Sequence, residues 1–296
     1  MVEKIKAPLR KIETLGIPTV AAINGAALGG GFEICLSAHH RVAINNPKLK
    51  VGLPEVTLGL LPGGGGVARM VRLLGIEKAL PFLMEGKQSS PEKALKAGLI
   101  HDIAEDADDL MAKAKAWILE NPKSQQPWDV KGYKLPGGAP SHPAVAQKLA
   151  IVPSILRQKT KGCYPAPEKI LAAAVEGAQV GFDHACTIES RYFTELTTSQ
   201  VAKNMIGTFW FQLNEIKAGG SRPDGIEPYT TKKVGILGAG MMGAGIAYST
   251  AIRGIEVVLK DVSLEAAEKG KAYSEGLLKK RVSRKQMTEE KKEKIL

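Results

Sequence analysis

Residues 233–247 read KVGILGAGMMGAGIA, and this stretch decides how the C-terminal part of the chain folds. It opens with Lys233–Leu237, a short apolar run that predicts a strand, and a glycine-rich turn leads to an expected helix over Ala244–Arg253. A second apolar strand is expected at Glu256–Leu259, and an acid, Asp261, closes it. Because the glycines stand between a strand and a helix, the pattern predicts a βαβ unit.

The glycines of this turn, Gly238-Ala239-Gly240-Met241-Met242-Gly243, have the G-x-G-x-x-G spacing of dinucleotide-binding turns. Gly238 permits the tight turn, Gly240 lets backbone N–H groups approach a pyrophosphate, and Gly243 lets the helix pack closely on the strand. Asp261 would accept hydrogen bonds from ribose hydroxyls, and no arginine follows it to neutralise a 2′-phosphate, so the sequence favours NAD over NADP. A βαβ unit that binds no nucleotide is the alternative.

The region before this unit contains a proline-rich segment, followed by a segment whose apolar residues have helical spacing. Eight of the 17 prolines fall between Asn121 and Pro167, which predicts a connection with little regular structure. From Glu168 a stripe of apolar residues that ends at Leu196 predicts one long packing helix, with Glu189 as its single polar interruption. A second helix is expected to carry Val201, Met205, Phe209 and Leu213, and residues 219–225 are expected to form a linker.

Nearer the N-terminus, a second glycine-rich pattern accompanies two glutamates. The sequence NGAALGGGFE (residues 24–33) follows an expected strand at residues 19–23, and GLPEVTLGLLPGGGG occupies residues 52–66. Glycines that open a helix expose N–H groups able to stabilise a developing oxyanion, and Glu33 and Glu55 could share acid and base work there. The residues alone leave this open, since Glu33 could instead pair with a helix dipole and the four glycines could form a flexible loop.

Shorter elements are expected around these motifs. The sequence predicts an amphipathic helix at Lys4–Thr14, a helix at Phe32–Ser37 and a strand at Arg41–Ile44. Ser90-Pro91 at one end and Gly98 at the other frame another helix.

These motifs together resemble a known family. The segments PTVAAINGAALGGGFEICLSAHHRVA, KVGLPEVTLGLLPGGGG and ALKAGLI strongly resemble the crotonase (enoyl-CoA hydratase/isomerase) family. The order of crotonase motif, helical linker and VGILGAGMMGAGIA resembles the multifunctional α-subunits of bacterial fatty-acid β-oxidation complexes. The resemblance implies an α/β fold: a partial crotonase-like ββα spiral domain (1–120), a proline-rich connection and helical linker (121–229), and the start of a Rossmann dinucleotide-binding domain (230–296).

The resemblance also implies a function and a set of site residues. It implies that water adds to a 2-enoyl-CoA and that NAD then oxidises the 3-hydroxyacyl-CoA formed. Glu33 would deprotonate the water, Glu55 would protonate Cα, and the Gly30 N–H would be half of the thioester oxyanion hole. The implied NAD contacts are Gly238, Gly240, Met241, Met242, Gly243 and Asp261.

Two other functions stay open. One is a non-catalytic NAD-binding or scaffold chain that docks on a thiolase-type partner. The other is a crotonase-fold isomerase, although the paired Glu33 and Glu55 favour hydration because isomerisation needs only one proton shuttle. The expected partners are an acyl-CoA thioester and, in a complex, a thiolase β-subunit.

The resemblance is incomplete at both ends of the chain. The family's second oxyanion N–H is expected upstream of residues 1–296, and none of the five histidines follows the nucleotide fingerprint, so no dehydrogenase histidine can be assigned. We therefore expect a fragment cut inside both catalytic domains, with marginal stability and little or no activity.

Composition excludes several classes of protein. The chain has 296 residues, of which 44% are hydrophobic and 24% charged, an ordinary globular balance. Three widely spaced cysteines without a C-x-x-C pair indicate a reducing compartment, and with no secretory signal we expect a cytoplasmic protein without a metal site. The apolar stretch Ile17–Ala38 is interrupted by glycines and Glu33, so no transmembrane segment is expected. Nearly half of the net charge of +11, namely +5, lies in the mixed-charge tail at residues 271–296, and a tail of this kind does not predict nucleic-acid binding.

Overall fold

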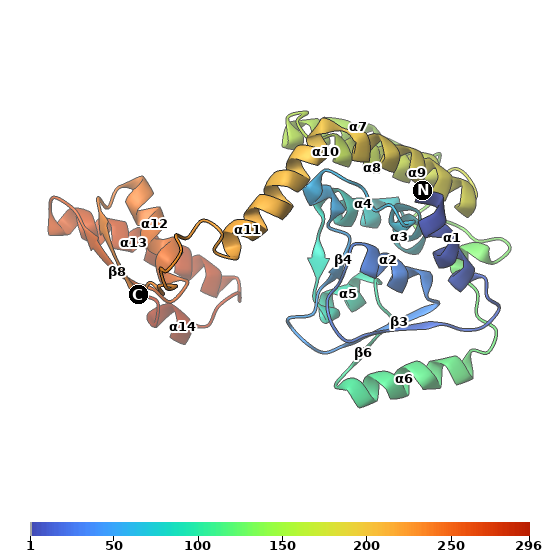
Figure 1. Ribbon diagram of the computed structural model, residues 1–296, viewed down its shortest axis with the longest axis horizontal. Helices are drawn as coiled ribbons and strands as arrows, with labels where there is room; N and C mark the ends of the chain where they lie inside the picture. The colour runs from blue at the N-terminus through green and yellow to red at the C-terminus, as the bar shows by residue number, and fades with distance from the viewer. Residues whose placement is uncertain (1) are drawn as a thin grey trace. The chain divides into compact units, whose positions relative to one another are not determined.

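The N-terminal glycine run lies between short strands and a helix, as expected. β1 (Val20–Ile23) and β2 (Ala27–Leu28) lead to α2 (Gly30–Ser37), and β3 (His40–Ile44) follows in the computed structural model, which describes residues 2–296 (Figure 1). Gly29, the residue before α2, has φ +56°, a conformation that side chains larger than glycine rarely adopt. Glycine is therefore required where the chain turns into α2.

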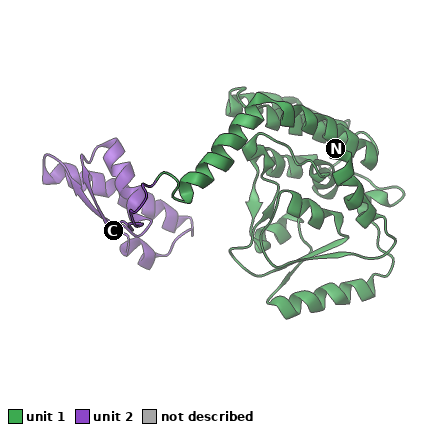
Figure 2. Cartoon of the chain, viewed as in Figure 1, with its two compact units in different colours: residues 1–221 green, residues 222–296 purple. Residues whose placement is uncertain are grey.

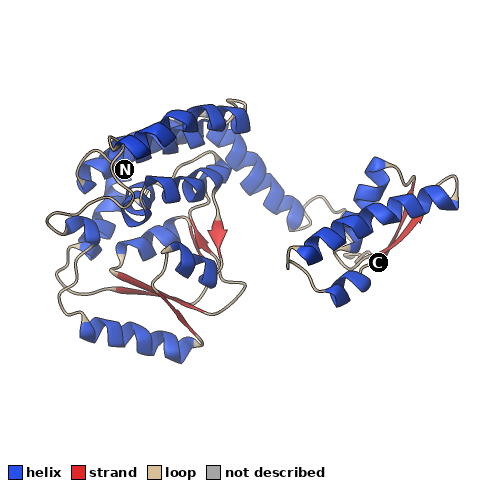
Figure 3. Cartoon of the chain, turned by 180° about the vertical axis from the view of Figure 1, so that it is seen from behind, coloured by secondary structure: helices blue, strands red, loops and turns tan. Residues whose placement is uncertain are grey.

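Two small sheets organise this part of the chain. In the first, β1, β3 and β6 (Asp102–Ala104) are parallel, with Val20 opposite His40 and Val42 opposite Asp102. The second contains β2, β4 (Val51–Gly52) and β5 (Gln88–Ser89). The remaining structure is mainly helical (Figure 3). The bounds are α3 (Gly66–Leu74), α4 (Ile76–Glu85), α5 (Pro91–Ala97), α6 (Ala107–Glu120) and the 3₁₀ helices η1 (Glu55–Leu58) and η2 (Pro127–Asp129).

The main hydrophobic core lies under α2. Phe32 and Leu36 of α2 are buried against apolar residues of α3 and α4, among them Met70 and Leu83. α6 packs on the β1-β3-β6 sheet, where Val42, Ala104 and Leu110 form a smaller cluster. Burial of α2 against α3 brings the glycine run next to the four glycines that precede α3.

Two expectations for the following region are wrong. The proline-rich stretch contains an 18-residue helix, α7 (Pro143–Thr160), because Pro143 occupies the first helical position, where no N–H donor is needed. The long helix expected from Glu168 is two helices, α8 (Pro165–Gly177) and α9 (Phe182–Thr198). The apolar periodicity continues across the break because both helices pack on the same core.

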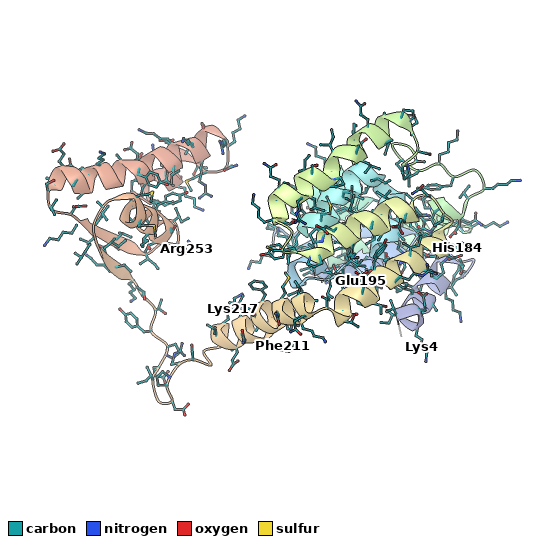
Figure 4. All side chains as sticks on the ribbon, turned by 90° about the horizontal axis from the view of Figure 1, so that it is seen from above. Lys4, His184, Glu195, Phe211, Lys217 and Arg253 are labelled. Carbon is teal, nitrogen blue, oxygen red and sulfur yellow. The ribbon has the colours of Figure 1, made fainter. Side chains whose placement is uncertain are left out.

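The second helix expected in this region is confirmed, with an irregularity. α10 (Gln200–Met205), a π-helical segment (Ile206–Gln212) and α11 (Leu213–Lys217) follow one another without a break (Figure 4). Ala202 is buried, whereas Phe209, Trp210 and Phe211 are exposed. Tertiary packing therefore covers only the beginning of this helical run.

The first helix, α1 (Val2–Glu13), is attached by buried charges as well as by apolar contacts. Lys6, Leu9 and Glu13 are its buried residues. The Arg69 Nε donates to Glu13 Oε1 over 2.6 Å, and both side chains are almost completely enclosed. Breaking such a buried pair strands a charge in the interior, so α1 is firmly held on α3.

Residues 222–296 form a second compact unit, separate from residues 1–221 (Figure 2). β7 (Lys233–Leu237) and β8 (Glu256–Lys260) are parallel, and α12 (Met241–Ala251) connects them, which confirms the expected βαβ unit. α13 (Leu264–Ser283) and α14 (Glu289–Glu293) follow.

The contact between α12 and the turn before it tolerates only glycine at one position. A Cβ at Gly243 would collide with the Gly238 carbonyl oxygen, whereas a Cβ at Gly245 would meet nothing within 4 Å. We expect Gly243→Ala to destabilise the second unit by about 1–3 kcal/mol through overpacking. Gly245→Ala, its control on the same helix, should stabilise by up to about 1 kcal/mol because alanine favours helix. Amide hydrogen exchange of β7 and β8 in the full chain measures both effects, and equal effects of the two substitutions would contradict the assigned contact.

Candidate active site

The four glycines before α3 form a loop whose N–H groups are held by two buried carboxylates. This tetraglycine loop comprises Gly63–Gly66. The N–H groups of Gly64 and Gly66 both donate to Glu33 Oε1, each over 2.7 Å. The Gly65 N–H donates to Glu189 Oε1 over 2.7 Å, and the Ala68 N–H donates to Glu189 Oε2 over 3.1 Å. The loop is therefore ordered by hydrogen bonds, contrary to the flexible-loop alternative.

Glycine is required in this loop because the carboxylates approach its backbone closely. A Cβ at Gly64 would lie 2.6 Å from Glu33 Oε2, and a Cβ at Gly66 would lie 2.7 Å from Glu33 Oε1. Gly65 has φ +97°, in the left-handed region. Side chains here would push the Glu33 carboxylate away from its donors.

Cations from α1 and α3 balance the negative charges around the loop. Lys6 Nζ lies 2.9 Å from Glu189 Oε1 and also donates to the Cys186 carbonyl oxygen. Arg69 Nη1 donates to the Gly64 carbonyl oxygen over 2.7 Å, while its Nε pairs with Glu13. Charged groups thus bind both the N–H groups and a carbonyl oxygen of the loop backbone. Hydrogen bonds to charged groups are stronger than those to neutral groups.

Glu33, predicted as a catalytic carboxylate, is on α2 and only 4% exposed. Burial and the negative charges of Glu189 and Glu55 raise its pKa, while the Gly64 and Gly66 N–H groups oppose the rise. The carboxylate lies at the N-terminus of α3, where the helix dipole also favours negative charge. Glu33 is on α2, whereas its N–H donors belong to the loop and first residue of α3.

Glu55, the second predicted carboxylate, begins η1 and lies against Gly29. A Cβ at Gly29 would be 3.1 Å from Glu55 Oε1. Among the described residues, its buried Oε2 has no hydrogen-bond partner. Burial is the main cause that raises the pKa of Glu55 to about 7, and the Glu189 charge adds to it. A buried carboxyl oxygen without a donor favours the protonated form.

Gly30, the predicted oxyanion donor, is the first residue of α2 and directly follows Gly29. It is exposed, and a Cβ there would meet nothing within 4 Å. N–H groups in the first turn of a helix have no partner within that helix, and the dipole there favours negative charge. The structure therefore brings the buried Glu33 and the half-buried Glu55 to the same open helix N-terminus.

The predicted nucleotide turn is open to solvent in the second unit. Gly238 has φ +90°, Gly240 precedes α12 with open space around it, and Met241 and Met242 are exposed. The Asp261 carboxylate accepts hydrogen bonds from the Ala239 N–H (2.5 Å) and the Val262 N–H (2.6 Å), which lower its pKa. Asp261 is consequently ionised and connects the end of β8 to the glycine turn, with lone pairs left for a further donor.

Sequence reasoning missed part of the first site. It treated Glu189 as a polar interruption of a packing helix, and it assigned no role to Lys6, Glu13 or Arg69. The available signal was a lone carboxylate in an otherwise apolar stripe, which indicates a buried partner. Its partners are 121 and 124 residues away in sequence, at Ala68 and Gly65.

Among residues 2–296, no group of three or more His, Cys, Asp or Glu side chains is placed to hold a metal ion. Within the same residues, no helix has the length and apolar character needed to cross a membrane.

Comparison with known proteins assigns families to both parts of the chain. Residues 1–127 match the enoyl-CoA hydratase/isomerase family, and residues 233–296 match the NAD-binding domain of 3-hydroxyacyl-CoA dehydrogenase. The fatty acid oxidation complex subunit alpha of Shewanella loihica is 38% identical over 94% of this chain. The same subunit of Idiomarina loihiensis is 35% identical over 100% of this chain. The chain spans 39% and 41% of these two relatives.

Solved structures similar to this chain include enoyl-CoA hydratases. The enzyme from Mycobacterium avium subsp. paratuberculosis is 22% identical, with a TM-score of 0.47 over 70% of this chain and 69% of its own. The enzyme from Bacillus anthracis is 24% identical, with a TM-score of 0.38 over 74% of this chain and 66% of its own.

The family matches confirm the expected fold class and its order along the chain. Residues 1–127 thus carry an enoyl-CoA hydratase/isomerase domain and residues 233–296 the NAD-binding domain of 3-hydroxyacyl-CoA dehydrogenase, in a chain that is similar over almost its entire length to fatty acid oxidation complex α-subunits.

Proposed function

We propose that this chain is part of a bifunctional enzyme that hydrates 2-enoyl-CoA and oxidises the resulting 3-hydroxyacyl-CoA with NAD. One observation carries the hydratase half: the buried Glu33 belongs to α2, and the half-buried Glu55 lies against Gly29, the residue that precedes the open N-terminus of the same helix. Coupled carboxylates with different hydrogen-bond environments are suited to acid and base roles.

The hydrogen bonds support different roles for the two glutamates. Glu33 accepts two N–H donors, whereas Glu55 has a buried oxygen with no donor. Burial and neighbouring negative charges raise the pKa of Glu33 to about 8 and that of Glu55 to about 7, so near neutral pH the two carboxyls share a proton. The two N–H donors stabilise the charge on Glu33, which favours placing that proton on Glu55. Glu33 therefore acts as the base that orients a water molecule and takes its proton. Glu55 acts as the acid.

In the proposed hydration step, Glu33 and Glu55 transfer one proton each. As Glu33 removes a proton from water, the water oxygen bonds to Cβ of the enoyl thioester, and the electrons of the double bond move to the thioester oxygen. The Gly30 N–H donates to that oxygen. The enolate collapses as Cα takes the Glu55 proton, and a proton passes from Glu33 to Glu55 before the next turnover. An oxyanion donor of this kind contributes about 3–4 kcal/mol in other enzymes.

The second unit is proposed to hold NAD, which when bound accepts a hydride from the 3-hydroxy carbon. The open turn at Gly238–Gly243 leaves room for a pyrophosphate, and the α12 N-terminus complements its charge. Met241, Met242 and Gly243 form the first turn of that helix and would contact the dinucleotide. Asp261 would accept hydrogen bonds from the ribose hydroxyls, and its charge would disfavour NADP.

Several related expectations stay predictions. They are the domain division at residues 120 and 229, the acyl-CoA substrate, a thiolase β-subunit as partner and a cytoplasmic location.

The roles of Glu33 and Glu55 are tested with crotonyl-CoA as substrate. The rate of hydration is measured as the decrease in enoyl thioester absorbance. Hydration by residues 1–296 is expected to be weak, and we expect Glu33→Gln and Glu55→Gln each to lower its kcat by about a further 100-fold or more, because each removes one proton-transfer step. Glu195→Gln, which changes an exposed residue of α9 (Figure 4), should leave kcat unchanged. NAD binding in calorimetry without any hydration by the unsubstituted chain would instead favour the scaffold function.

The protonation of Glu55 also predicts how stability depends on pH. Its pKa of about 7 in the folded chain exceeds the ordinary value of 4.5, so folding favours the protonated form. The resulting stabilisation is complete below about pH 4.5 and is lost as the pH rises through 7. Relative to Glu55→Gln, the free energy of unfolding should fall by about 2–3 kcal/mol between pH 5 and 8. Urea unfolding followed by tryptophan fluorescence checks this, since all three tryptophans lie before residue 222. Parallel pH profiles for the two proteins would refute it.

The cofactor preference is tested at Asp261. We expect Asp261→Asn to reduce the ratio of NAD to NADP affinity by about tenfold or more, because it removes the charge that repels a 2′-phosphate. Calorimetric titration with both nucleotides gives the ratio. Asp224→Asn in the exposed linker is the control, and an unchanged ratio in Asp261→Asn would show that this carboxylate does not face the ribose.

A further inference from the structure

Consecutive N–H groups of the tetraglycine loop alternate between two carboxylates. Glu33 holds those of Gly64 and Gly66, and Glu189 holds that of the intervening Gly65, together with Ala68. Because three successive peptide groups are involved, a change at Gly65 alters the direction of both neighbouring N–H groups. The position of the Glu33 carboxylate therefore depends on Glu189, although the two side chains have no donor in common.

Glu189 is itself fixed from two directions. It is 1% exposed on α9, and Lys6 of α1 provides its counter-charge at 2.9 Å. The same Lys6 Nζ donates to the Cys186 carbonyl oxygen, one turn before Glu189 on the same helix. Because the Lys6–Glu189 ion pair is held at both ends, the Glu189 carboxylate has a fixed position. It therefore restricts the tetraglycine loop to fewer backbone conformations than glycine residues would adopt without it.

We propose that Glu189 is a positioning residue for the hydration step, which it affects by holding the tetraglycine loop in the conformation that orients Glu33. The proposal rests on the proposed hydratase function. Glu189 acts through Gly65 and Ala68 and is not assigned a contact with substrate.

The charge of Glu189 has a second effect, on the ionisation of both catalytic glutamates. It raises the pKa of Glu33 and that of Glu55. The other charged groups around the loop are Lys6 and Glu13 from α1 and Arg69 from α3. Removing the Glu189 charge while these remain should therefore move the pH dependence of catalysis to lower pH.

Amide hydrogen exchange of residues 1–296 tests the positioning role without any substrate. Glu189→Gln keeps the side-chain size but offers one acceptor oxygen in place of two and no charge for Lys6. We expect exchange at Gly64 and Gly66 to rise at least tenfold, as well as at Gly65 and Ala68, with β1 and β3 unchanged. Glu195→Gln is the control on the same helix, and its exchange should match that of the unsubstituted chain.

Two other exchange patterns would overturn the proposal. Faster exchange confined to Gly65 and Ala68 would show that Glu189 serves only its own donors. A uniform rise that includes β1 and β3 would show general destabilisation. If Glu189→Gln does not fold, Glu189→Asp, which keeps the charge but shortens the reach, is subject to the same criteria.

Hydration kinetics provide the second measurement. Glu189→Gln should lower kcat at least tenfold with KM changed less than twofold, and the pH profile of kcat should shift to lower pH. Unchanged kcat in a hydrating protein would overturn the positioning role. If the unsubstituted chain hydrates no enoyl-CoA, the proposed function fails instead, and the exchange pattern at Gly64 and Gly66 still decides whether Glu189 positions the loop.

Discussion

The buried N–H groups of the tetraglycine loop require acceptors, and this requirement organises the N-terminal unit. A buried amide without a partner costs on the order of 1–3 kcal/mol, and four such groups lie close together at the start of α3. Carboxylates from α2 and α9 satisfy them. Glycine is needed at positions 64 and 66 because a side chain there would occupy the space of the Glu33 carboxylate, and at position 65 because it would meet Arg69.

This solution places negative charges near one another in the interior. Glu33, Glu55 and Glu189 interact, so burial and mutual repulsion raise the pKa of the first two. Lys6 and Arg69 offset the cost by pairing with Glu189 and with Glu13. The arrangement that stabilises the loop thus also leaves Glu33 with two N–H donors and Glu55 with one buried oxygen that has no donor, a difference of the kind that separates acid and base roles.

The second unit solves a simpler packing problem. The α12 helix approaches the Gly238 carbonyl so closely that Gly243 must lack a Cβ, and Asp261 connects the strand end to the turn through the Ala239 N–H. Both features leave the N-terminus of α12 open. The hydrogen-bonding capacity of that helix end is therefore available to a ligand.

The sequence by itself determined the local elements and the residues of the two motifs. The strand before each glycine run, the helix after it and the need for glycine at positions 238 and 243 depend on backbone sterics within a few residues, which local sequence records. The break between α8 and α9, the helix that begins at Pro143 and the partners of Glu189 were decided only by the tertiary structure. Lys6, Gly65 and Glu189 are far apart in sequence, and no periodicity connects them. Their association depends on which buried donors and charges remain unpaired after the helices have packed.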